Sequence, residues 1–335
     1  MWLRTWILGL VLGGCALGAA AAEPMVLKFS HVVAPNTPKG LGAQKFAELA
    51  ARYTDGAVRV EVYPNSTLYK DKEEMEALQL GAVEFIAPSL AKFGPLGVRA
   101  FEVFDLPYIF DSFEALHEVT RGALGQDMLA LLEPRGIKGL AFWDNGFKSF
   151  SANRPLRRPE DFKGLSMRIQ SSKVLDAQMR ALGASPRVTA FSEVYQALAA
   201  HVVDGTENPH SNFFTQRMNE VQSHMTITNH GYLGYAVITN TKFWDGLPGG
   251  IRAALERAMR DATEYTNAIA KAENDKALDA VRAAGTTQIH EPTERERAEF
   301  KRALLPVHKA MASWIGVDLI EDIYDETGFD PGGLD

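Results

Sequence analysis

The sequence has 335 residues, of which 46% are apolar, and a formal net charge of −7. A chain of this length and composition can bury the cores of two lobes of ordinary size. The acidic balance argues against nucleic acid and against anionic membrane surfaces as partners. An acidic protein that binds an anion therefore needs a local cluster of cations.

The N-terminus has the features of a secretory signal peptide. Arg4 precedes an apolar run over residues 6–17, and alanines at 19–22 precede Glu23. We expect residues 1–22 to be a cleaved signal peptide and the mature chain to be exported. No later segment offers a long uncharged stretch, so we expect no direct membrane insertion of the mature chain.

Cys15 is the only cysteine and lies inside this signal. Residues 12–15 loosely resemble a lipoprotein cleavage box, but the alanines at 20–22 offer the better cleavage site. If Cys15 leaves with the signal, the mature chain has no thiol for disulfides, thiolate catalysis or cysteine metal sites.

The first part of the mature chain alternates expected strands with expected helices. These elements lie over residues 26–31, 39–54, 58–62, a helix beginning near 71, and 85–87. The spacing of Asp71 and Glu74 is that of a capping box, which predicts the start of the second helix. The β-α-β-α-β order predicts a parallel sheet with helices on both faces. Residues 143–146 read as a turn and as the first crossing between lobes.

The strand over residues 165–170 places Met167 and Ile169 on one face and Arg168 on the other. Arg168 therefore lies opposite the face that packs on the core.

Between Pro248 and Ala284 there is no further proline and little glycine, and the apolar residues share a stripe, which predicts one long helix. The other expected elements are an interrupted helix from 111 to about 132, a strand over 137–142, helices over 174–182, 192–201 and 211–221, a strand over 235–239, and a helix capped by Thr293 and Glu296.

No motif of a common enzyme class is present. The sequence lacks a metal-protease helix motif, a nucleophile elbow and a Walker loop. Lys45 occupies the place of the third glycine in a stretch that begins, at Gly40, like a dinucleotide fingerprint. The histidines are scattered without metal-ligand spacing. We therefore expect no catalytic residue, no metal site and no cofactor, and do not expect an enzyme.

The chain resembles the DctP-type solute receptors of TRAP (tripartite ATP-independent periplasmic) transporters. The matching stretches follow in family order, at residues 28–33, 161–168, 191–198, 203–209, 220–222 and 243–248. One such stretch alone would be a weak signal, but six in order are specific. The resemblance implies an α/β fold of the periplasmic binding protein type, with two lobes, hinge strands, a long bracing helix and an organic acid enclosed between the lobes.

The resemblance also implies a division of the chain into lobes. After the signal peptide at 1–22, lobe I comprises residues 23–145 plus about 231–270, and lobe II comprises 146–230 plus about 271–310. The long helix, about 248–284, spans both lobes, and residues 311–335 form a C-terminal segment.

Two residues match the ligand-binding positions of the family. Arg168 matches the arginine that forms a two-pronged salt bridge to a ligand carboxylate, a geometry that suits a guanidinium. The alternative is a structural ion pair with an Asp or Glu. Asn208 matches the asparagine that donates to the ligand, and its alternative is a turn residue ahead of Pro209.

Further polar residues are weaker candidates for the same cleft. Lys148 stands where sialic-acid receptors of the family carry a second arginine, and a lysine cannot make the same fork, which favours a smaller acid. Asp71 also matches a cleft position, although helix capping explains it. The remaining candidates, for which ordinary surface or core is the alternative, are Lys39 and Lys92 for a second carboxylate, Ser89, Ser211 and Asn212 for hydrogen bonds, and Phe191 as an aromatic wall.

The amino-acid sequence is most similar to that of the C4-dicarboxylate-binding branch at residues 147–150, 164–168, 171–184 and 230–235. The expected function is to bind malate, succinate or fumarate and deliver it to the small and large membrane subunits of the transporter. Three alternatives stay open: a receptor for another carboxylate such as a 2-oxoacid, sugar acid or aromatic acid; a periplasmic enzyme acting on an organic acid; and a ligand-sensing partner of a receptor kinase.

Overall fold

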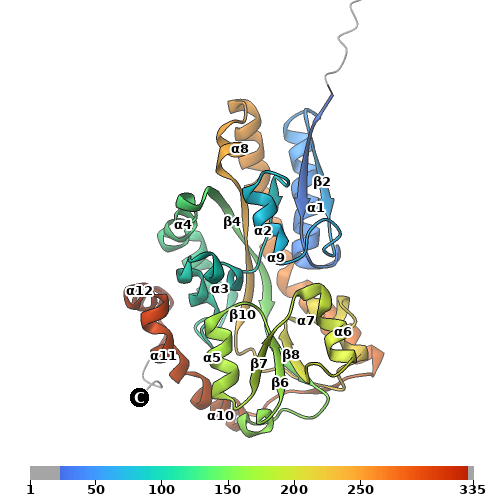
Figure 1. Ribbon diagram of the computed structural model, residues 1–335, viewed down its shortest axis with the longest axis vertical. Coiled ribbons are helices and arrows are strands. Elements are labelled where there is room, and N and C mark those ends of the chain that lie inside the picture. The colour runs from blue at the N-terminus through green and yellow to red at the C-terminus, as the bar shows by residue number, and fades with distance from the viewer. Residues whose placement is uncertain (1–22, 331–335) are drawn as a thin grey trace, which may run out of the picture.

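The chain folds into two α/β lobes, each built on one β-sheet (Figure 1). The computed structural model describes residues 23–330, so the predicted signal peptide at 1–22 and residues 331–335 lie outside the described part. We call the elements around the five-stranded sheet lobe I and those around the six-stranded sheet lobe II. The predicted fold class is confirmed.

The sheet of lobe I has the strand order β2-β1-β3-β10-β4. Its first three strands along the chain pair in parallel, as predicted, whereas β10 pairs antiparallel with β3 and β4. Phe29 stacks on Trp143 at a centroid distance of 5.7 Å, so β4 is anchored in the core of this lobe. The strands are β1 (Met25–Ser30), β2 (Val58–Tyr63), β3 (Phe85–Ile86), β4 (Ile137–Phe147) and β10 (Tyr232–Asn240).

The sheet of lobe II has the strand order β11-β9-β5-β8-β6-β7. Strand β6 pairs in parallel with β7 and β8 and carries Met167 and Ile169 into the core of this lobe. Arg168 points to the opposite face, as the alternation predicted. The strands are β5 (Ser149–Ala152), β6 (Ser166–Ile169), β7 (Ser185–Val188), β8 (Gly205–Asn208), β9 (His224–Thr226) and β11 (Gln288–His290).

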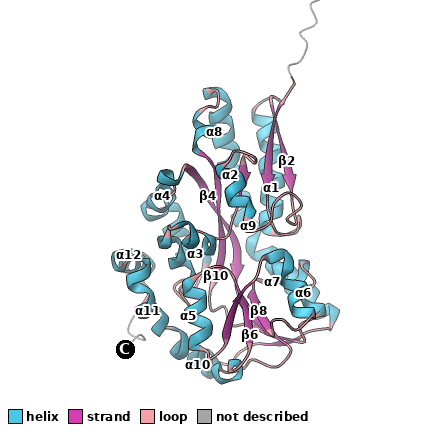
Figure 2. Cartoon of the chain, viewed as in Figure 1, coloured by secondary structure: helices cyan, strands magenta, loops and turns pink. Residues whose placement is uncertain are grey.

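Helices flank both sheets (Figure 2). Those of lobe I and its surroundings are α1 (Pro38–Tyr53), α2 (Glu73–Gln79), α3 (Phe113–Arg121), α4 (Ala123–Ala130) and α8 (Thr241–Asp245). Those of lobe II are α5 (Lys173–Ala181), α6 (Val194–Ala199), α7 (His210–Thr215) and α10 (Glu294–Leu304). The C-terminal segment forms α11 (Pro306–Ile315) and α12 (Val317–Thr327), which pack on α5 and α3 respectively. None of the described helices has the length and apolar character that crossing a membrane requires.

The predicted long helix is confirmed as α9 (Gly249–Ala284), which ends at Gly285 with a left-handed φ of 66°. It contacts α1 and β4 of lobe I and α7 of lobe II. A Cβ on Gly42 of α1 would lie 2.2 Å from the hydroxyl of Thr266, so glycine allows the two helices to approach closely. Helix α9 therefore braces both lobes.

The predicted turn at residues 143–146 is wrong, because β4 continues through it. These residues pair with β10 on one side. On the other side Asn267 of α9 accepts a hydrogen bond from the Asp144 amide at 2.9 Å and donates to the Phe142 carbonyl at 3.3 Å. A helix more than 100 positions away thus satisfies backbone groups that a local turn would otherwise have to satisfy.

Local capping signals have mixed outcomes. Thr293 and Glu296 form the predicted capping box of α10. The predicted capping box of Asp71 and Glu74 is wrong, since α2 begins after Lys72 without a side-chain cap. The helices expected over 192–201 and 211–221 are shorter, each joined to a 3-10 turn, η6 (Phe191–Glu193) and η7 (Met218–Glu220).

Candidate ligand-binding site

Arg168 is a buried cation that forms no salt bridge within residues 23–330. The residue is 2% exposed, and its Nε and Nη2 atoms both donate to the carbonyl oxygen of Thr189, at 3.1 and 2.9 Å. Burial lowers the pKa of Arg168, while the carboxylates of Asp71 and Glu207 act the other way. A guanidinium stays charged in such surroundings. The site therefore contains a desolvated cation whose charge an anion can balance.

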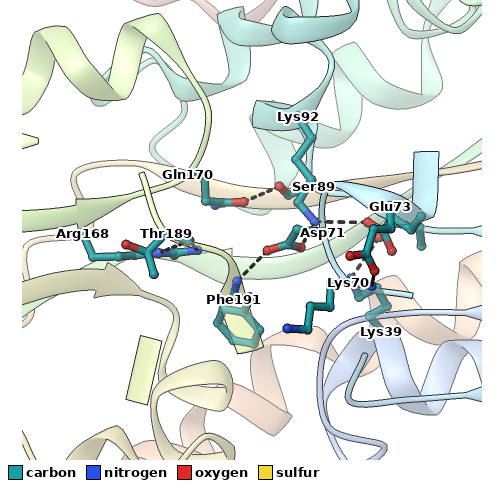
Figure 3. A network of polar contacts seen from close by, with 12 residues as sticks. Lys39, Lys70, Asp71, Glu73, Ser89, Lys92, Arg168, Gln170, Thr189 and Phe191 are labelled. Atoms are coloured by element: carbon teal, nitrogen blue, oxygen red, sulfur yellow. Dashed lines mark hydrogen bonds and ion pairs between the residues drawn. The ribbon is translucent and has the colours of Figure 1, made fainter. Parts of the chain in front are cut away.

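Asp71 links the two lobes. Its carboxylate pairs with Lys92 in the 3-10 turn η1 (Leu90–Lys92) and accepts a hydrogen bond from the backbone N–H of Phe191 in lobe II (Figure 3). Lys92 also contacts Glu74, with Nζ 3.1 Å from Oε1. Burial alone would raise the pKa of Asp71, but Lys92 and the Phe191 amide hold it at about 2. Asp71 is thus an ionised carboxylate at the junction of the lobes.

Lys39 is a second buried cation without a salt bridge among the described residues. It lies in the first turn of α1, is 1% exposed, and donates from Nζ to the carbonyl oxygen of Ala87 at 2.9 Å. The same Nζ lies 3.8 Å from the centroid of the Tyr235 ring. Burial, and then the charge of Lys92, lower its pKa to about 7. Because its charge is only weakly favoured here, a nearby anion would strongly affect its protonation.

A cavity between the lobes joins these groups. It has an inner chamber of about 20 Å³ and an outer chamber of about 190 Å³, and Asp71, Lys92, Arg168 and Gln170 line both. A hydrogen bond from Ser89 of lobe I to Gln170 of lobe II closes one side. A single water needs roughly 10–15 Å³ on this measure. The lobes are therefore closed tightly on the inner chamber, and an organic acid needs the surrounding groups to move.

Residues 29–314 match the family described as "Bacterial extracellular solute-binding protein, family 7", abbreviated DctP. The chain belongs to this family. A relative from Rhodobacter capsulatus, named C4-dicarboxylate-binding periplasmic protein DctP, is 66% identical over 319 residues, which cover 94% of this chain and 96% of the relative. The family resemblance that the sequence predicted is confirmed.

Solved structures of TRAP periplasmic solute-binding proteins share the fold of this DctP-family chain. The protein from Shewanella oneidensis, with bound succinate, has a TM-score of 0.88 and 39% identity, covering 91% of this chain and 99% of its own. The protein from Pseudomonas aeruginosa PAO1, with bound L-malate, has a TM-score of 0.84 and 43% identity, covering 86% and 100%. A galactonate-binding protein from Advenella mimigardefordensis has a TM-score of 0.88 at 27% identity, covering 91% and 98%.

Most of the predicted site residues meet at the inner chamber. Lobe I supplies its part from the first turn of α1 and from the segment that follows β3, and lobe II from β6, η6, β8 and α7. The predicted residues that line the chamber are Lys39, Ser89, Lys92, Arg168, Phe191, Asn208 and Asn212. Their contact with a ligand remains a prediction.

Lys148 and Ser211 are the predicted site residues that do not line either chamber. Lys148 is 1% exposed and forms a salt bridge with Glu207, with Nζ 2.8 Å from Oε1. His230 contacts the other oxygen of the same carboxylate at 2.8 Å. Ser211 donates from Oγ to Asn145 at 2.8 Å. Both residues therefore contact side chains that lie outside the cavity lining, Glu207 for Lys148 and Asn145 for Ser211.

Three polar residues that line the inner chamber were missed or misjudged from the sequence. Gln170 shares the Arg168 face of β6, so strand alternation could have identified it. Asp71 was assigned to helix capping although it also matched a family cleft position. Tyr235 lines the inner chamber from β10, and no local pattern distinguishes it from a core residue of that strand.

Proposed function

We propose that the protein is a periplasmic receptor for a C4-dicarboxylate such as succinate, malate or fumarate. The proposal rests on the surroundings of Arg168. Its buried guanidinium lines the cavity between the two lobes, and its Nε and Nη2 atoms both donate to a single carbonyl oxygen. A carboxylate supplies both the charge and the paired acceptors that this group lacks. Relatives and solved neighbours that bind C4-dicarboxylates support the choice of ligand class.

A dicarboxylate needs cations at both of its ends. We propose that Arg168 in lobe II binds one carboxylate, with Asn208 donating beside it, and that Lys39 in lobe I attracts the other. Lys92 lies beside Lys39 at the chamber but already pairs with Asp71 and Glu74, so it contributes less net charge. Such a ligand is contacted by both lobes only when they are closed, so it stabilises the closed arrangement. Exclusion of water then strengthens both ionic contacts.

The lobe limits belong to the same proposal. Residues 23–145 with about 231–270 would move against 146–230 with about 271–310. Strand β4 runs directly into β5 through Lys148, and residues 227–231 lead from β9 to β10, which supports these two passages as the hinges. The closed protein would then be recognised by the small and large TRAP membrane subunits. Export through a cleaved signal peptide at residues 1–22 would place it in the periplasm.

A ligand panel tests the proposal. The purified mature chain would be titrated calorimetrically with succinate, malate and fumarate, and with pyruvate, galactonate and benzoate as representatives of the other acid classes. A ligand that binds only the folded state also raises the melting temperature, which gives an independent readout. We expect the C4-dicarboxylates to bind most tightly. Tighter binding of a monocarboxylate or sugar acid would overturn the ligand class, and release of a chemically altered product would overturn the receptor assignment.

A further inference from the structure

Asn145 is a fully buried amide at the point where β4 leaves lobe I. Its Nδ2 group donates to Asn212 Oδ1 at 3.0 Å and to the Tyr235 hydroxyl oxygen at 2.8 Å. Its Oδ1 accepts from Ser211 Oγ at 2.8 Å. Every hydrogen-bonding group of the Asn145 side chain is therefore engaged, and two of its partners line the inner chamber.

With the hydrogen bonds in this direction, Asn212 and Tyr235 present donor groups to the cavity. The Oδ1 of Asn212 is occupied by Asn145, so the remaining group of that side chain is the NH₂ donor. The Tyr235 oxygen accepts from Asn145, so its own hydrogen is available to donate. No acceptor for that hydrogen is found among the hydrogen bonds of residues 23–330. Both side chains thus offer donors at the cavity wall.

A carboxylate in the chamber favours this direction of the hydrogen bonds. Ser211, Asn212 and Tyr235 can each donate or accept, so their hydrogen bonds with the Asn145 side chain do not by themselves fix the direction. An ionised carboxylate only accepts, and it would repel the lone pairs that the opposite direction presents. Burial raises the pKa of Tyr235 to about 12, although the amides of Asn145 and Asn212 act the other way. The phenol therefore keeps its proton at neutral pH.

Asn145 is itself held in place by the bracing helix. Asn274 of α9 donates to the Asn145 carbonyl at 2.8 Å and accepts from the Ser211 amide at 2.9 Å, so it fixes the strand and the start of α7 together. A Cβ on Gly146 would lie 2.9 Å from the Asn274 amide nitrogen, so glycine permits this approach. Since these two partners are obligate acceptor and donor groups, the orientation of Asn274 is fixed.

Tyr235 also supports Lys39, the cation assigned to the ligand end that Arg168 does not bind. Lys39 Nζ lies 3.8 Å above the Tyr235 ring. We propose, building on the dicarboxylate function above, that Tyr235 is a specificity-determining residue: its hydroxyl donates to the ligand carboxylate opposite Arg168, and Asn145 is the residue that positions it. Together with Lys39 and the Asn212 amide, it forms an array of donors that selects an acceptor-only, ionised group.

The test compares succinate with succinamate, in which a neutral amide replaces one carboxylate. Tyr235→Phe removes the hydroxyl but keeps the ring beneath Lys39. A hydrogen bond to an ionised group is about twice as strong as one between neutral groups. We expect this variant to lose about 10- to 100-fold in succinate affinity and less than about 10-fold in succinamate affinity, measured by calorimetry. Equal losses for both ligands, or no loss for succinate, would overturn the proposal.

A second arm tests the positioning role of Asn145. Asn145→Ala should reduce succinate affinity to a similar extent, and adding Tyr235→Phe to it should cost no more than about threefold further, because the two residues act through one hydroxyl. Asn267→Ala is the matched control, since Asn267 bonds the same strand without lining the cavity, and it should leave the succinate-to-succinamate ratio unchanged. Additive losses would overturn the positioning role.

The outcomes separate this inference from the proposed function. Wild-type protein that binds no C4-dicarboxylate overturns both. Wild-type protein that binds succinate and loses it on Arg168→Ala, while Tyr235→Phe weakens both ligands equally, overturns the donor array alone. The Phe variant is decisive by itself if Asn145→Ala does not fold. Its melting temperature should fall by only a few degrees, because the buried Asn145 amide loses one acceptor, so the variant should still be folded for the titrations.

Discussion

Arg168 and Lys148 are both buried cations of lobe II, yet their surroundings differ. Lys148 has a carboxylate partner, Glu207, at 2.8 Å, and His230 contacts the same carboxylate. Burial alone would raise the pKa of Glu207, but Lys148 and His230 bring it to about 2, so this carboxylate is ionised. Arg168 instead donates to a neutral carbonyl. The charge of Lys148 is balanced inside the protein, whereas Arg168 forms no salt bridge within residues 23–330, and we propose that a ligand balances its charge.

This difference is the basis on which we propose Arg168 as a ligand-binding cation and Lys148 as a structural one. Burial alone does not separate them, because both residues are almost fully shielded from solvent. The presence of a carboxylate partner does, since an unpaired buried charge costs several kcal/mol and persists only where something else favours it. The following measurements test that distinction, from the largest expected effect to the smallest.

Lys148→Met should strongly destabilise the folded protein. It leaves the buried Glu207 carboxylate without its cation, a change that costs about 3–5 kcal/mol. Urea denaturation of the ligand-free protein at neutral pH measures this. Arg168→Met is the matched control, and its free energy of unfolding should stay within about 1 kcal/mol of wild type because no carboxylate loses a partner. Equal destabilisation by the two variants would remove the distinction between the two cations.

Lys39 extends the comparison, because it too forms no salt bridge with a carboxylate among residues 23–330. Its pKa in the ligand-free protein is about 7, below the ordinary value of 10.5. Between these values the unfolded chain binds the proton and the folded protein does not, so stability should rise with pH across this window. A dianionic ligand favours charged Lys39, so binding should take up a proton there, and affinity should fall as pH rises from 7 towards 10.

Calorimetry in buffers with different ionisation enthalpies measures this proton uptake. At about pH 8.5 we expect close to one proton per ligand bound, since Lys39 changes from neutral to charged. The variant Lys39→Met should bind more weakly and without proton uptake. Uptake that persists in the Met variant, or none in wild type, would show that Lys39 does not sense the ligand.

Thr293→Ala should have the smallest effect. It removes the hydroxyl that caps α10, which costs about 1 kcal/mol of stability. Thr293 does not line the cavity, so succinate affinity should be unchanged. Thermal unfolding and calorimetry of one preparation measure both quantities. A change in affinity would mean that stability and binding are coupled, and the binding effects of the other variants would then need correction for stability.

Much of the fold could be predicted from local sequence patterns. The helix α9, the parallel order of β1 to β3 and the capping box of Thr293 follow from periodicity and spacing. The turn predicted at residues 143–146 was wrong because β10 and Asn267 of α9 satisfy the backbone there, and both are distant in sequence. Local rules fail where a distant element supplies the hydrogen bonds.

The site could be predicted only in part, for a similar reason. Arg168 was identified because strand alternation and a family match both indicated it. The capping box of Asp71 and Glu74 was wrong because Lys92 and the Phe191 amide provide stronger partners than a helix terminus. The salt bridge between Lys148 and Glu207 could not be predicted from local sequence patterns, since the two residues are 59 positions apart.

The most direct test of the central claim is calorimetric titration of Arg168→Ala and Arg168→Lys with succinate. Removing one partner of a buried charged contact costs about 2 kcal/mol or more, a loss of at least about 30-fold in affinity. The Ala variant should show this loss with its stability unchanged, and the Lys variant should restore only part of the affinity because lysine lacks the paired donors. Near wild-type affinity in the Ala variant would contradict the assignment of Arg168 as the ligand-binding cation.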